Sequence, residues 1–142
     1  MEQVNKTVLT IKNIIKAPVK KVWEYWTKPE HITQWNNASE DWHTPRAEND
    51  LRVGGQFTAR MEAKDGSMGF DFGGVYEAVK ENEYIEYTMD DGRNVSVRFT
   101  SNGEHTKLEE RFDAEETNSV EMQRTGWQAI LDNFKKYAER NA

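Results

Sequence analysis

Glu110 is the residue with the clearest potential for chemistry, because it interrupts an apolar strand pattern. Leu108, Glu110 and Phe112 alternate with polar residues and therefore share one strand face. A lone carboxylate on a buried face is costly unless it is paired or protonated. Such a group can orient a polar ligand atom or act as a general base. The alternative is a bulge or register shift that places Glu110 at the rim, beside Arg111 or Arg60.

Metal and thiol chemistry are not predicted by this sequence. His31, His43 and His105 lack the HxH or HExxH spacing of metal ligands. We interpret them as solvated or capping histidines. The chain contains no cysteine, which excludes disulfides and thiolate nucleophiles.

Other polar groups suited to catalysis are sparse. No Ser–His–Asp order or carboxylate pair stands out, and Tyr76 and Tyr87 are the further candidates for acid–base chemistry. Gly54-Gly55 precedes a strand and lacks a following Lys-Ser/Thr, so we interpret it as a strand bulge rather than a phosphate-binding loop. We expect no cofactor and no metal, with Glu110 as a weak catalytic candidate.

Residues 17–35 predict two short helices, whose apolar faces must pack against a large part of the remaining chain. Pro18 suits a helix start, and Lys28-Pro29 ends the first helix because the residue before a proline disfavours the α region. The apolar residues have helical spacing in both segments. They are Val19, Val22, Trp23 and Trp26, and then Ile32 and Trp35.

Period-two alternation predicts a series of antiparallel strands. We expect a first strand at residues 6–16, a loop at 36–49, a short strand at 51–53 and a continuous meander from residue 56 to 112. Hairpin signals at Asp65-Gly66, Asp91-Gly92 and Asn102-Gly103 separate its strands. The inward faces of the first two meander strands are predicted as Phe57, Ala59, Met61 and Ala63, and as Phe70, Phe72, Gly74, Tyr76 and Ala78.

The chain ends in a predicted long helix at residues 119–139. Asn118 is the expected N-cap, with Glu121 completing a capping box. At about 1.5 Å per residue the helix is roughly 30 Å long, the width of a small domain. Its apolar stripe is Val120, Trp127, Ile130, Leu131, Phe134 and Ala138.

Composition narrows the classes of function. The net charge is −6, which argues against nucleic-acid binding because that needs a basic surface. No apolar run is long enough to span a membrane, and no secretory signal is recognisable at the N-terminus. A chain of 142 residues suits one domain with a real core. We expect a cytoplasmic protein that is a monomer or a weak homodimer.

Short motifs, in order, carry a resemblance to a known family. They are Ala17-Pro18-x-x-x-Val22-Trp23, Thr27-x-Pro29-Glu30-His31, Trp35, Asp50-Leu51-Arg52-Val53-Gly54-Gly55, the Asp65-Gly66 turn, Gly74-x-Tyr76 and Gly126-Trp127. Together they resemble the small single-domain homologues of the activator of the heat-shock-protein-90 ATPase. This family belongs to the START-like (SRPBCC) superfamily.

The resemblance implies an α+β helix-grip fold over residues 1–142, with a curved antiparallel sheet around the C-terminal helix. It also implies a ligand cavity between sheet and helix. The expected lining is Trp23, Phe57, Met61, Phe70, Phe72, Tyr76, Val97, Phe99, Leu108, Trp127, Leu131 and Phe134. The alternative is that these side chains fill a solid core, because protein interiors are normally close-packed. Gly126 favours close approach of a strand or a ligand, since glycine is otherwise unfavourable within a helix.

Three functions remain open at this point. The first is a binding protein for a small apolar or aromatic molecule, such as a lipid or polyketide-like compound. The second is an enzyme of the cyclase or aromatase kind found in the same superfamily. The third is a co-chaperone-like protein. Because the resemblance is to members without the N-terminal domain that carries the main chaperone contact, we expect no stimulation of the chaperone ATPase.

Overall fold

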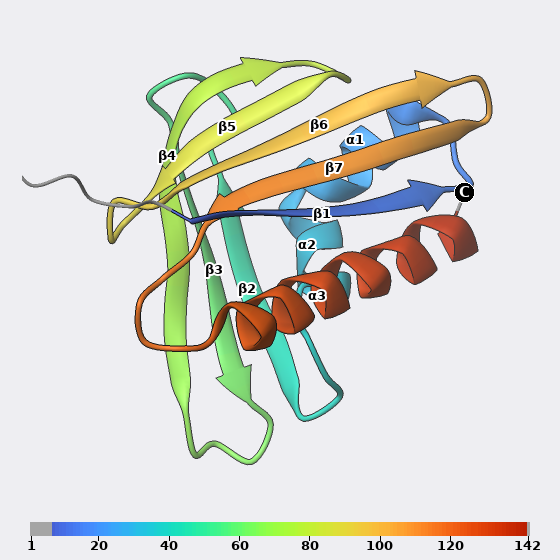
Figure 1. The fold of residues 1–142 in the computed structure, drawn as a ribbon. Helices are drawn as coiled ribbons and strands as arrows, with labels where there is room; N and C mark the ends of the chain where they lie inside the picture. The colour runs from blue at the N-terminus through green and yellow to red at the C-terminus, as the bar shows by residue number, and fades with distance from the viewer. Residues whose placement is uncertain (1–6, 142) are drawn as a thin grey trace, which may run out of the picture.

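A seven-stranded antiparallel sheet curves around the C-terminal helix in the computed structural model, which describes residues 7–141 (Figure 1). The strand order is β1-β7-β6-β5-β4-β3-β2, so β2 to β7 form a meander and β1 joins beside β7. The strands are β1 (Val8–Ile15), β2 (Trp42–Asn49), β3 (Gln56–Ala63), β4 (Gly69–Lys80), β5 (Tyr84–Met89), β6 (Asn94–Asn102) and β7 (His105–Asp113). The predicted helix-grip fold is confirmed.

The two proline-marked helices are α1 (Val19–Thr27) and α2 (Pro29–Trp35), as predicted. Lys28 has extended backbone angles, ends α1 and precedes Pro29 at the first position of α2. The indoles of Trp26 and Trp35 stack at 4.9 Å. Both also meet Phe134 of α3 edge-on at 4.9 Å, so α1 and α2 close one end of the curved sheet.

The long helix α3 (Val120–Asn141) runs along the concave side of the sheet (Figure 1). Leu131, Phe134 and Ala138 are buried, whereas Val120 in the first turn is exposed. The predicted N-cap was wrong by one residue. The Ser119 hydroxyl accepts from the Met122 N–H at 3.1 Å, while Asn118 donates to Glu115.

β2 is a strand where the sequence predicted a loop. Pro45 caused the error, because a proline usually argues against a strand. Here β2 is one of the two edge strands of the sheet, and its register with β3 shifts between His43 and Arg46. A proline is tolerated at an edge or bulge because no ladder hydrogen bond is lost there.

Two further local predictions were wrong. Residues 51–53 form turns rather than a strand, and Gly54-Gly55 brings this loop against β4 through hydrogen bonds of 2.9 Å with the Tyr76 backbone. The prediction that Ala78 faces inward was also wrong, because a register shift lies between Tyr76 and Ala78 on β4. After it, Val79 faces Ile85 on the core side and Ala78 faces the opposite side.

The core fills only part of the concave face. At the end near α1, Trp23 packs on Phe99 at 5.1 Å, and Val97, Leu108 and Phe134 are completely buried. The opposite end lies between β3–β5 and the first half of α3, and it remains open. The candidate site lies at this open end.

Candidate functional site

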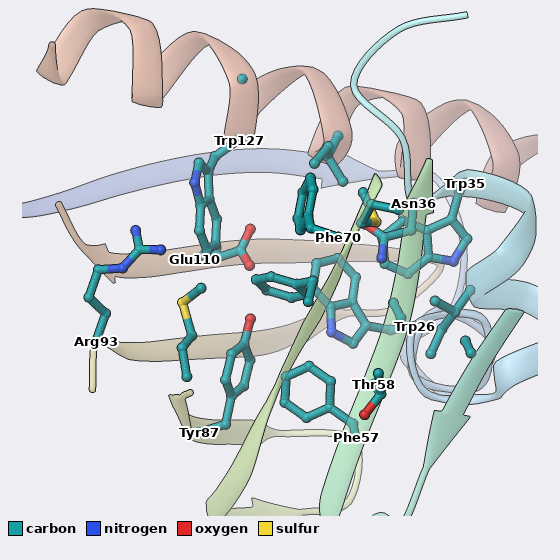
Figure 2. A pocket seen from close by; sticks show the side chains of 18 of the residues that line it. Trp26, Trp35, Asn36, Phe57, Thr58, Phe70, Tyr87, Arg93, Glu110 and Trp127 are labelled. Atoms are coloured by element: carbon teal, nitrogen blue, oxygen red, sulfur yellow. The ribbon is translucent and has the colours of Figure 1, made fainter. Parts of the chain in front are cut away.

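A cavity of about 410 Å³ lies between the concave face of the sheet and the first half of α3. Trp26 and Trp35 stand at one end of it and Arg93 and Glu110 at the other (Figure 2). Phe70 on β4 and Met122 on α3 line it while remaining 50% and 62% exposed, so the cavity opens to solvent between these elements.

Aromatic rings make up much of the wall. Phe57 on β3 meets Tyr87 edge-on at 4.6 Å and lies 5.3 Å from the Tyr76 ring. On the helix side, Trp127 stacks on Phe112 at 3.9 Å with an interplanar angle of 8°. Rings fixed in this way present a rigid apolar surface, which suits flat apolar ligands.

Glu110 lies inside this cavity rather than at a rim. Its Cα is paired with Val97 on β6 and Ile11 on β1, and the residue is 6% exposed. No residue in the described range hydrogen-bonds its carboxyl group. Desolvation raises the pKa of Glu110 to about 8, so the group is mostly neutral at pH 7. Neither arginine of the rim alternative is its partner: Arg60 binds Glu62 and Asp71, and Arg111 is exposed on the opposite face of β7.

Tyr76 and Tyr87 differ in what their hydroxyls contact. The Tyr76 hydroxyl donates to Asn49 Oδ1 at 2.5 Å, and Asn49 donates in turn to the Thr27 carbonyl. Within residues 7–141, the Tyr87 hydroxyl has no hydrogen-bond partner. Burial, and then the nearby Glu110 carboxylate, raises the pKa of Tyr87 well above its ordinary value.

Gln123 holds the rim next to the helix start. Its side-chain oxygen accepts from the Glu115 N–H at 2.8 Å, and its amide group donates to the carbonyls of Glu115 and Asn118. Gln123 is 7% exposed although it is polar. It therefore fixes the loop between β7 and α3 as one wall of the opening.

Half of the predicted lining residues line the cavity and half do not. Those on it are Phe57, Met61, Phe70, Phe72, Tyr76 and Trp127. Those packed in the filled core instead are Trp23, Val97, Phe99, Leu108, Leu131 and Phe134. Strand alternation identified the correct face but carried no information on which end of that face the helices fill. A binding role for the residues on the cavity stays a prediction.

Sequence reasoning missed several lining residues. Ile85 and Met89 flank Tyr87 at alternate positions of β5, so their period of two was the available signal. Trp26 and Trp35 were assigned only to helix packing, and nothing in their spacing shows that they also end a cavity.

Gly126 borders the cavity without a close neighbour. A Cβ built there meets no atom within 4 Å. The strand-contact explanation for this glycine is therefore wrong, and the space beside it is part of the cavity.

Two of the three histidines contact other side chains, and His105 is exposed. His31 Nδ1 lies 2.5 Å from the Tyr137 hydroxyl, and His43 lies 3.7 Å from Glu62. Across residues 7–141, no three His, Asp or Glu side chains gather in a way that could hold a metal ion. None of the described helices is long and apolar enough to cross a membrane.

Comparison with known proteins gives the family. The family model described as "Activator of Hsp90 ATPase homolog 1-like protein" matches residues 16–139. This chain belongs to that family, and its fold is that of the START-like superfamily. The search of curated proteins found no match.

Solved structures agree with this assignment. An AHSA1-like protein from Aeromonas hydrophila is 44% identical, with a TM-score of 0.89, over 95% of this chain and 94% of that one. A protein from Cytophaga hutchinsonii is 55% identical, with a TM-score of 0.80, over 93% and 92% of the two chains. A Nitrosomonas europaea protein shares the fold at 19% identity and a TM-score of 0.81, over 95% and 96% of the chains.

Proposed function

We propose that this chain binds a small apolar or aromatic molecule in the cavity between the sheet and α3. The observation that carries the proposal is a volume of about 410 Å³ bounded by aromatic rings and open at one side. Ligand pockets are typically about 300–1,000 Å³, mostly apolar, with a few polar groups that orient the ligand. Lipids and polyketide-like compounds are the classes that we expect.

A thermal-shift screen with lipids and aromatic natural products tests this function. A ligand that binds only the folded state stabilises it by about 2.7 kcal/mol at one hundred times Kd. We expect Gly126→Leu to weaken the best hit at least tenfold, because the new side chain enters the open space. Thr125→Leu is the matched control, since Thr125 is exposed on the same helix and does not line the cavity. A screen without hits, or equal binding by both variants, contradicts the proposal.

An enzyme of the cyclase or aromatase kind is the alternative that Glu110 favours, because an acid inside an apolar cavity can transfer protons. Turnover of a bound compound that is lost in Glu110→Gln, with affinity retained, supports the enzyme. Binding without turnover supports the binding protein.

Family membership also fits a co-chaperone-like domain. If the chain works through its cavity, adding it leaves the steady-state ATPase rate of Hsp90 unchanged. A several-fold rise in that rate supports the co-chaperone function instead.

A further inference from the structure

Two long polar side chains in the cavity lack hydrogen-bond partners in the described chain. Glu110 is 6% exposed and Tyr87 is 7% exposed, and both line the cavity. Their polar atoms face open space rather than a closed core, because no fully buried side-chain nitrogen or oxygen in residues 7–141 lacks a hydrogen-bond partner. A pair of such groups facing one space is therefore a candidate for a ligand contact.

Strand register places the two groups together. On β6, Val95 pairs with Tyr87 and Val97 pairs with Glu110, so the two polar residues flank β6 on the same face. Both valines are fully buried. The carboxyl group of Glu110 and the hydroxyl of Tyr87 point into the same space (Figure 2).

Neighbouring polar groups are already engaged elsewhere. Tyr76 donates to Asn49, and the Arg93 guanidinium binds Asp91 at 2.7 Å. Glu115 accepts from the backbone and side chain of Asn118. Among the described residues that line this end of the cavity, Glu110 and Tyr87 are the polar ones whose side chains make no hydrogen bond.

We propose that Glu110 and Tyr87 form a subsite that donates two hydrogen bonds to one carbonyl oxygen of a flat aromatic ligand. The subsite rests on the proposed binding function and adds a ligand class to it, namely aromatic ketones. A carbonyl oxygen has two lone pairs, and a protonated carboxyl and a phenol each supply one donor. The rings of Phe57 and Trp127 provide apolar surface for the rest of such a molecule.

A matched ligand pair tests the subsite directly. The probes are 9-fluorenone and fluorene, which are rigid tricyclic molecules that differ in C=O against CH₂. We expect calorimetry or tryptophan quenching at pH 6 to show about tenfold tighter binding of fluorenone, as one or two net hydrogen bonds imply. Tyr87→Phe and Glu110→Met should each lower that ratio at least threefold, with fluorene affinity retained.

Two further variants keep the test specific. Glu110→Gln retains an N–H donor and should preserve most of the ratio. Tyr76→Phe removes a hydroxyl that is already paired, so it should leave the ratio unchanged even if both affinities shift. Fluorene binding by each variant also reports that the cavity is intact.

The possible outcomes separate the two proposals. Equal binding of both probes, or a ratio unaffected by Tyr87→Phe and Glu110→Met, overturns the subsite and leaves the binding function standing. Failure of both probes to bind the wild-type protein overturns the binding function for flat aromatic molecules, and the subsite with it.

Discussion

The carboxyl group of Glu110 is the main candidate for acid–base chemistry in this cavity. Its pKa of about 8 arises from desolvation, since no charged partner in the described chain offsets the burial. Tyr87, Arg93 and Glu115 line the same cavity from β5, the turn after β5 and the loop before α3. Tyr87 stays neutral, because its own pKa is raised, and Arg93 is held by Asp91.

This pKa makes folding stability depend on pH in a defined direction. Between the ordinary value of 4.5 and about 8, the folded state keeps a proton that the unfolded state has lost. The free energy of unfolding therefore falls as pH rises through this window, by about 1.4 kcal/mol per unit from this group. Glu110→Gln should remove this slope. Urea unfolding of both proteins at pH 5, 6.5 and 8 measures it, and parallel profiles would contradict the assignment.

At the scale of elements, proline and hairpin signals predicted the order of helices and strands well. Pro18 and Pro29 marked α1 and α2, and the three glycine turns marked the β3–β4, β5–β6 and β6–β7 connections. Two local features caused the errors: Pro45 lies in an edge strand, and a register shift after Tyr76 reverses the face of the interior strand β4. A period of two cannot reveal where a strand bulges, because the bulge depends on pairing partners.

Helix α3 contains a stabilising substitution site. Gly126→Ala places a Cβ in open space and restores helix propensity, so it should raise the free energy of unfolding by about 1 kcal/mol. Chemical denaturation measures this change. Gly55→Ala is the contrasting control and should destabilise, because its Cβ would overlap the Asp50 carbonyl oxygen. Destabilisation by Gly126→Ala would show that the space is filled.

The loop before α3 depends on one side chain. Gln123→Ala removes three hydrogen bonds to Glu115 and Asn118, so we expect a loss of about 1–3 kcal/mol and faster amide exchange at Glu115. Hydrogen exchange followed by NMR measures the local effect. Arg124→Ala, at an exposed position of α3, serves as control and should change stability by under about 0.5 kcal/mol. Unchanged exchange at Glu115 would mean that the loop is held otherwise.

The whole molecule divides its concave face between a filled core and an open cavity. The side chains that the family resemblance implied as the lining of one cavity separate into these two parts, because α1 and α2 pack against only one end of the sheet. Residue spacing reveals which face is apolar, but the helix positions that divide it arise from long-range packing. Family membership accounts for the fold, whereas the proposed binding function rests on the side chains that line the open cavity.

Intermolecular NOEs between fluorene and isotope-labelled protein test the central claim most directly. The account predicts contacts from fluorene protons to the side chains of Phe57, Phe72 and Trp127 inside the cavity. Contacts confined to exposed side chains such as Val53, which lies outside the cavity lining, would contradict it. So would the absence of any contact at saturating fluorene.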